Sequence, residues 1–284
     1  MHFKKLQQME EQFLSSGYRT EYRMEQGESM IPGDGRWLNI ARCRPLKRSG
    51  YYHAEVMEKE RIVLHFTVGH LKADIATLTI NRLHVSAAFV IARNGTIIQL
   101  FSPEYWSGHI GNGIGNSNNA EDKKTIAIEL SNYGPLLPVK NLETVYSRKA
   151  PVGSPHAGLV DTYCSMKEAG AYTKLDKGFR GHGYFAAFTD AQYESLSLLL
   201  RYLTARFDIP RSFLPETDRY VATDKVKTFK GIVSHVNYRA SGKWDIGPAF
   251  DWARVIGRVS GEEGENVLRE GAENAKNFLS MAAP

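Results

Sequence analysis

A short polar segment near the C-terminal end of the chain contains an imidazole, an ammonium and a carboxylate. In SHVNYRASGKWDIG (residues 234–247), His235 lies ten positions before Asp245, and Lys243 lies two positions before it. Imidazole nitrogen and carboxylate oxygen both bind zinc, at about 2.0–2.2 Å. The segment is therefore either a solvated polar loop or part of a metal site that takes a further ligand from elsewhere in the chain.

His65 is the candidate for that further ligand. It lies within RIVLHFTV (residues 61–68), where its neighbours are apolar. Taken alone, this position indicates a core histidine that is hydrogen-bonded to a carbonyl, because a buried imidazole without partners is costly. With His235 and Asp245 it makes a set of three ligands, and a catalytic zinc with three protein ligands keeps its fourth position for water.

Glu129 and Lys243 could supply the remaining chemistry of a hydrolase. In TIAIEL (residues 125–130), Ile126 and Ile128 point to one side of a strand and Glu129 points to the other. A glutamate there either caps a neighbouring group or takes a proton from an attacking water. Lys243 is either a solvated surface lysine or an ammonium that stabilises the oxyanion formed at a carbonyl. Together the five residues indicate metal-assisted hydrolysis.

The secondary structure predicted around these residues alternates between strands and helices. Asn94-Gly95 separates two apolar runs and predicts a hairpin, and Thr189 and Gln192 form a capping box that predicts a helix start. The predicted strands are 61–68, 125–134 and 231–236, the predicted hairpin is 87–101, and the predicted helices are 72–83 and 188–210, the last closed by Pro210. This order predicts an α/β fold with a central mixed β-sheet flanked by helices.

We expect a single catalytic domain at residues 56–256. Residues 1–55 read as an N-terminal extension, and residues 257–284 read as a C-terminal tail. Residues 135–181 are long, irregular and rich in glycine and proline, which is typical of a functional loop, so we expect an insertion near the substrate groove.

The composition indicates which classes of partner are compatible with the chain, but it does not identify one of them. The 284 residues are 42% hydrophobic, with a formal net charge of +5 and a pI near 9.0. This charge suits an anionic polymer such as nucleic acid, an acidic wall glycan or a membrane surface. The basic segment RCRPLKR (residues 42–48) has no nucleic-acid recognition motif beside it, so we expect no nucleic-acid partner.

Membrane, disulfide and secretion signals are also missing from the pattern. No apolar run approaches the roughly 18 residues of a membrane span, and Cys43 and Cys164 form no CxxC pair. The first residues lack the apolar region of a signal peptide. We therefore expect synthesis in the cytoplasm without a signal peptide and no membrane partner.

Five sequence blocks resemble a known enzyme family. In chain order they are HFT (65–67), VSAAFVIARNGTIIQL (85–100), WSGHIG (106–111), NNAEDKKTIAIELSNYG (118–134) and H-x7-K-x-D (235–245). Together they resemble the zinc-dependent N-acetylmuramoyl-L-alanine amidases, whose superfamily includes the peptidoglycan-recognition proteins and amidase-type phage lysozymes. The resemblance covers roughly residues 58–255.

The resemblance implies roles for individual residues. His65, His235 and Asp245 correspond to the ligands of one zinc ion. Glu129 corresponds to the glutamate that activates the attacking water, and Lys243 to the lysine that polarises the scissile carbonyl.

Two further residues correspond to the substrate groove, and two positions depart from the family. His109 matches a histidine of the groove wall, or it is simply a turn residue. Trp106 beside it could stack on sugar or peptide or could pack in the protein. Ala88 stands where the family often has histidine or tyrosine, so we expect more of the proton transfer to fall on Glu129. Ile246 replaces the usual proline after Asp245, which affects the turn and not the ligation.

The resemblance implies hydrolysis of the amide bond between N-acetylmuramic acid and L-alanine in peptidoglycan or muropeptides. The alternative is a non-catalytic peptidoglycan-binding module, but the retention of every candidate ligand favours the enzyme. We expect the protein to reach the wall by release or by delivery from a phage, contractile particle or secretion system, or to serve cytosolic wall recycling. Residues 1–55 and the tail are the segments that could dock onto a partner.

Overall fold

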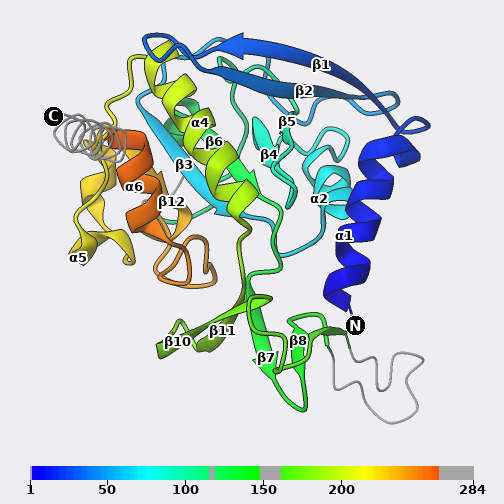
Figure 1. Cartoon of the computed structure of the whole chain (residues 1–284). Coiled ribbons are helices and arrows are strands. Elements are labelled where there is room, and N and C mark those ends of the chain that lie inside the picture. The colour runs from blue at the N-terminus through cyan, green and yellow to red at the C-terminus, as the bar shows by residue number, and fades with distance from the viewer. Residues whose placement is uncertain (1, 115–118, 148–160, 262–284) are drawn as a thin grey trace, which may run out of the picture.

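The fold comes from a computed structural model that describes residues 2–114, 119–147 and 161–261. Part of the predicted insertion and most of the predicted tail therefore lie outside the described residues. Within the described ranges, a large sheet and a long helix make the main body, and a smaller sheet projects from it (Figure 1).

The main sheet is mixed, as predicted. Its strands are β1 (Tyr22–Met30), β2 (Trp37–Pro45), β3 (Arg61–Phe66), β4 (Phe89–Ile91), β5 (Ile97–Gln99), β6 (Thr125–Leu130) and β12 (Gly231–Ser234). Their spatial order is β1-β2-β5-β4-β6-β3-β12. Strands β4, β6, β3 and β12 run parallel to one another, whereas β4–β5 and β1–β2 pair antiparallel.

The strands predicted from continuous apolar runs are all present. Every residue of β3 is buried, as expected for a strand with parallel neighbours on both sides. The predicted hairpin forms β4 and β5, with Gly95 in the left-handed conformation that its turn requires.

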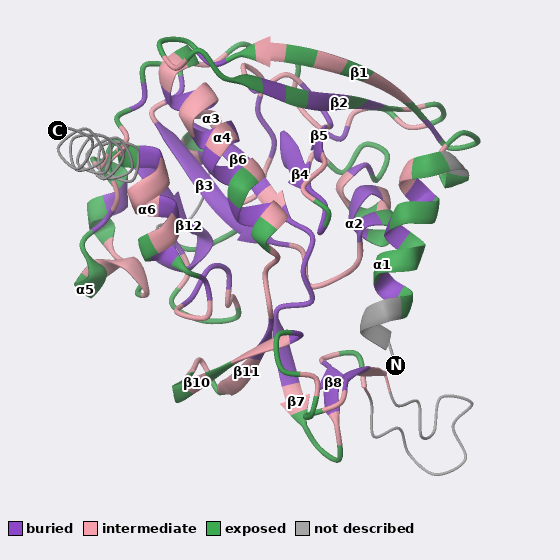
Figure 2. Ribbon diagram, in the orientation of Figure 1, coloured by how far each residue is buried: buried purple, intermediate pink, exposed green. Residues whose placement is uncertain are grey.

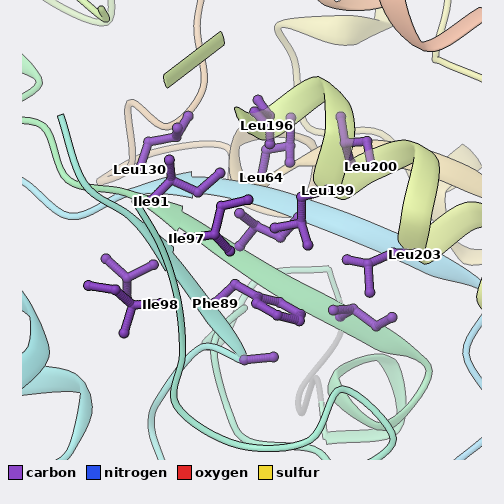
Figure 3. Packing of buried hydrophobic residues seen from close by; sticks show 14 of the residues in the cluster. Leu64, Phe89, Ile91, Ile97, Ile98, Leu130, Leu196, Leu199, Leu200 and Leu203 are labelled. Carbon is purple, nitrogen blue, oxygen red and sulfur yellow. The ribbon is translucent and has the colours of Figure 1, made fainter. Parts of the chain in front are cut away.

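The long helix α4 (Asp190–Arg206) covers one face of this sheet. Its start is the predicted capping box, in which the Thr189 hydroxyl accepts from the Gln192 backbone N–H. Figure 3 shows its leucines packed against residues from β3, β4, β5 and β6. Each fully buried leucine contributes about 1.5–3 kcal/mol of hydrophobic stabilisation, so this face is a principal part of the core.

The other helices are shorter. They are α1 (His2–Gln12), α2 (Leu71–Leu78), α3 (Asn119–Lys123), α5 (Glu216–Arg219) and α6 (Trp252–Ser260), with single turns η1 (Phe13–Gly17), η2 (Asp224–Lys227) and η3 (His235–Asn237). Helix α2 ends earlier than the predicted 72–83, because the backbone leaves the helical conformation at Thr79 and is left-handed at Arg82 and His84. None of the described helices is long and apolar enough to cross a membrane.

Much of the predicted N-terminal extension belongs to the main sheet. Strands β1 and β2 form an antiparallel hairpin, and β2 then pairs in parallel with β5, with Ile40 opposite Ile97. The sequence of residues 22–45 did not reveal this pairing, because its partner strand is more than 50 positions further along the chain.

The segment predicted to be irregular contains most of a second sheet. Its strands are β7 (Pro135–Pro138), β8 (Leu142–Thr144), β9 (Thr162–Cys164), β10 (Tyr172–Phe179) and β11 (His182–Ala186), in the order β10-β11-β7-β8-β9. Figure 2 shows that β10 has no buried residue, whereas β3 in the main sheet is buried throughout. The short strands β8 and β9 contribute Leu142, Tyr163 and Cys164 to a small hydrophobic core of their own sheet.

Candidate metal centre and active site

Three side chains with metal-ligating atoms meet at the carboxyl ends of parallel strands. His65 lies near the end of β3, and His235 follows the last residue of the neighbouring strand β12. Asp245 approaches from the loop that follows, and its carbonyl accepts a hydrogen bond from the Val236 N–H. All three side chains are buried, and their ligand atoms lie within 4.8 Å of one another.

The ligand atoms form a compact triangle. His65 Nδ1 lies 2.9 Å from His235 Nδ1 and 3.0 Å from Asp245 Oδ2, and His235 Nδ1 lies 2.8 Å from the same oxygen. The structure thus brings together the three residues that the sequence proposed as metal ligands, although they come from segments up to 180 positions apart.

Hydrogen bonds behind the triangle set the tautomer of each imidazole. His235 Nε2 is 2.8 Å from the Ile110 carbonyl oxygen, which can only accept, so this nitrogen carries the proton. The Thr125 hydroxyl donates to the Glu121 carbonyl and therefore accepts from His109 Nε2. His109 Nδ1 then accepts from His65 Nε2, at 3.0 Å.

These tautomers leave the Nδ1 lone pairs of both His65 and His235 directed into the triangle. Burial, followed by the charge of His235, lowers the pKa of His65 to about 4, so its ring is neutral near pH 7. The Nδ1 atoms of the two rings and a carboxylate oxygen then face one another, which is an arrangement that a cation stabilises.

The donor set fits zinc. Two imidazoles and one carboxylate are ligands that zinc uses, and a tetrahedral site with bonds of about 2.0–2.1 Å separates its ligand atoms by about 3.3 Å. The observed separations of 2.8–3.0 Å are close to this value. The hydrogen bonds from His65 and His235 to His109 and Ile110 match the supporting contacts that orient metal-ligating histidines.

Glu129 lies beside His65 on the same face of the sheet. The two residues are paired in the register of β3 and β6. Glu129 Oε2 is buried and has no hydrogen-bond partner among the described residues. Burial, followed by the charge of Asp245, raises the pKa of Glu129 well above its usual value, while Lys243 opposes this shift.

These groups share one small cavity of about 180 Å³. Its walls include the three ligand residues together with Glu129, Lys243, His109, Trp244, Phe66, Thr67, Val68, Leu78, Val85, Ser86 and Gly242. A carboxyl group without a partner and an ammonium group therefore border the same space as the metal-ligating atoms, as a hydrolytic site requires.

The sequence of this domain decides the family. Residues 56–248 match the family model described as N-acetylmuramoyl-L-alanine amidase. The chain belongs to this amidase family. The resemblance inferred from the five sequence blocks is thereby confirmed.

Three solved structures with a similar fold are distant from this chain in sequence. The amidase AmiD from E. coli is 19% identical with a TM-score of 0.45, covering 81% of this chain and 65% of its own. The endolysin amidase LysCS from Clostridium intestinale URNW is 12% identical with a TM-score of 0.40, covering 82% and 99%. An AmpD derivative is 16% identical with a TM-score of 0.37, covering 75% and 99%. The chain thus spans about two thirds of the length of AmiD, and no curated protein matches it.

Within this amidase domain, the two residues predicted for the groove lie in different places. His109 lines the cavity, and its ring also bridges His65 and Thr125. Trp106 stacks on His53, with ring centroids 3.9 Å apart, and its Nε1–H donates to Glu55. Trp106 is not among the described residues that line the cavity. Its contact with substrate stays a prediction.

Sequence reasoning missed Arg180, which holds the loop that carries the metal ligands. Its guanidinium donates to the Val236 carbonyl, directly after His235, and to the Lys243 carbonyl, two positions before Asp245. Arg180 lies at the tip of the β10–β11 hairpin, inside the segment predicted to be irregular. Only the position of that segment, as an insertion near the groove, could have indicated such a role.

Proposed function

We propose that this chain is a zinc-dependent amidase that hydrolyses the bond between the lactyl group of N-acetylmuramic acid and the L-alanine of a peptidoglycan stem peptide. The observation that carries the proposal is the meeting of three metal-ligating atoms beside Glu129 and Lys243 in one cavity. Membership of the amidase family supports the choice of bond.

The residues that would hold zinc are His65, His235 and Asp245. A zinc ion held there would polarise the scissile carbonyl and make an attacking water more acidic. The hydrogen bonds that the two histidines make behind the site hold the Nδ1 atom of each ring toward Asp245.

Glu129 is the proposed proton carrier. Its carboxylate accepts a proton from the attacking water and then passes it to the nitrogen of the departing L-alanine. The unpaired Oε2 atom supports this role, because no other described side chain competes for that oxygen. Burial keeps the carboxyl group away from bulk water, which favours a proton affinity suited to both steps.

Lys243 is the proposed stabiliser of the oxyanion. Its ammonium borders the cavity and opposes the charge of Glu129. In the reaction, a bond forms between the water oxygen and the lactyl carbonyl carbon, and the carbon–nitrogen bond breaks. The products are a lactyl carboxylate and a peptide with a free L-alanine amino group.

Mass spectrometry of the products tests this function. Purified sacculi and soluble muropeptides are incubated with the protein, with the protein plus a chelator, and with the chelated protein after zinc is restored. We expect peptides with a free L-alanine amino terminus, their loss with chelator, and their return with zinc. Retention on sacculi without any release of peptide, with zinc present, would instead identify a non-catalytic binding module.

A further inference from the structure

A second and larger cavity lies next to the basic segment RCRPLKR, which the catalytic site does not use. Its volume is about 830 Å³. The polar and aromatic side chains that line it are Arg42, Arg44, Arg48, Arg206, Glu28, Gln99, Ser29, Ser49, Ser102, Tyr51, Tyr52, Phe101, Tyr105 and Tyr202. No residue that lines this cavity also lines the catalytic one.

The two cavities lie on opposite faces of the main sheet. His65 and Glu129 alternate with Leu64 and Leu130, which pack with the leucines of α4 in Figure 3. The catalytic residues therefore point away from α4. The larger cavity lies on the α4 side, because the last turn of that helix contributes Tyr202 and Arg206 to its wall.

The charge of the larger cavity is strongly positive. Its lining contains four arginines and one glutamate. Arg48 donates to the Ala76 carbonyl, and Arg206 donates to Glu104, so these two guanidiniums are held by the protein. Arg42 and Arg44 are exposed, and neither guanidinium has a hydrogen bond or ion pair with any residue that the structure describes.

The aromatic rings of the cavity are stacked on one another. Tyr52 lies between Phe101 and Tyr105, with ring centroids 4.8 Å and 5.7 Å away and nearly parallel planes. Proteins that bind single-stranded nucleic acid leave ring faces open for the bases. Here Tyr52 already stacks on two neighbouring rings. The lining instead presents guanidinium, amide and hydroxyl groups, which suit the hydroxyls and acidic groups of a sugar chain.

We propose that this cavity is a binding site for an anionic glycan, a sugar chain that carries phosphate or carboxylate groups. Arg42 and Arg44 hold the acidic groups through paired N–H donors, and the hydroxyl and amide groups of the lining contact the sugar rings. The choice of a glycan rests on the proposed function, because a wall hydrolase meets such polymers beside its substrate. Binding on the face opposite the catalytic site leaves that site open to the stem peptide.

Binding of defined soluble polymers tests this site. The probes are phosphorylated dextran, polygalacturonate, neutral dextran and a single-stranded DNA of similar charge, each titrated into the full chain by calorimetry at low and moderate salt. The double variant R42Q/R44Q removes both unpartnered charges at exposed positions. The control variant K5Q/R19Q removes two charges at exposed positions elsewhere.

We expect wild type and the control to bind an anionic polysaccharide, dextran to show no binding, and R42Q/R44Q to bind at least tenfold more weakly. Preference for the phosphate or the carboxylate polymer identifies the acidic group. Equal binding by R42Q/R44Q and the control overturns the proposal, and tighter binding of DNA than of either polysaccharide overturns it in favour of a nucleic acid. Hydrolysis of a soluble muropeptide is measured in parallel and stays unchanged in R42Q/R44Q, so an inactive wild type would count against the proposed function alone.

Discussion

His65 Nδ1 and His235 Nδ1 lie 2.9 Å apart, and each also lies within 3.0 Å of the same oxygen of Asp245. In the neutral form of each ring Nδ1 carries no proton, because the opposite nitrogen donates to a fixed acceptor. Two nitrogen lone pairs that face each other at this distance in a buried site repel one another unless a positive charge lies between them. This relationship is the physical basis for the predictions about the metal.

Asp245→Asn should abolish most zinc binding and most hydrolysis. The substitution removes the only negative charge of the three ligands, and zinc chemistry supplies several kcal/mol of transition-state stabilisation, so we expect a loss of at least about a hundredfold in kcat/KM. Metal content per chain and muropeptide turnover are the measurements. Asp176→Asn, at an exposed position of β10, is the matched control and should retain both.

His109→Ala should weaken zinc binding while leaving the three ligands in place. His109 holds the proton of His65 on Nε2, and losing such a supporting partner costs about 10–100-fold in metal affinity or activity. Competition with a chromophoric chelator measures the affinity. His53→Ala removes an imidazole that does not line the catalytic cavity. If both variants bound zinc as tightly as wild type, the relay from Thr125 through His109 to His65 would have no role in the metal site.

Glu129→Gln should remove turnover and keep the metal. Glutamine has nearly the same shape but cannot carry the proton, and the loss of a general base typically costs about 10²–10⁴-fold. Release of free L-alanyl peptides and zinc content are measured on the same preparation. Turnover at the wild-type rate would show that another group moves the proton.

Arg180→Ala should loosen the loop between His235 and Asp245. Its guanidinium bridges two carbonyls of that loop, so its removal should lower zinc affinity several-fold and lower kcat. Arg180→Lys keeps the charge but lacks the fork that reaches both carbonyls, so we expect it to resemble the alanine variant. Rescue by lysine would mean that charge near Asp245, and not the bridge, is what matters.

The free energy of unfolding should decrease as pH rises toward 7, because the buried carboxyl group of Asp74 then loses its proton. Burial raises the pKa of this carboxyl from 3.8 to about 7. The folded state therefore binds the proton more tightly than the unfolded state. The resulting stabilisation is complete below about pH 4 and is lost progressively as pH rises to about 7, by at most about 4 kcal/mol.

Asp74→Asn mimics the protonated carboxyl and should remove this dependence. Its amide oxygen can still accept from the Ser131 hydroxyl, which lies 2.6 Å from the carboxylate in the wild type. Denaturant unfolding of both proteins at pH 5 and pH 8 measures the effect. We expect the variant to gain stability relative to wild type at the higher pH, and a difference that is the same at both pH values would contradict the assignment.

Several parts of the fold could be predicted because their signals are local. The hairpin at Asn94-Gly95, the capping box of Thr189 and Gln192, and the apolar run around His65 each depend on neighbours within a few positions. Turn chemistry, capping and strand burial act over that range, so the elements that carry the site were visible in the sequence.

The ligand set was also within reach of the sequence, since its residue types and the order of the family blocks are properties of the chain alone. The sequence could not predict which nitrogen of each histidine faces the other two ligands. That choice depends on the Ile110 carbonyl and on His109, and these groups come within hydrogen-bonding distance only when β3, β6 and β12 align.

Tertiary structure alone decided the placement of the remaining segments. Strand β2 pairs with β5, Arg180 reaches the ligand loop, and the RCRPLKR segment borders a cavity beneath the end of α4. Each of these contacts joins residues separated by more than 50 positions. Pairing over such distances is selected by the packing of the whole core, and no local pattern of residues encodes it.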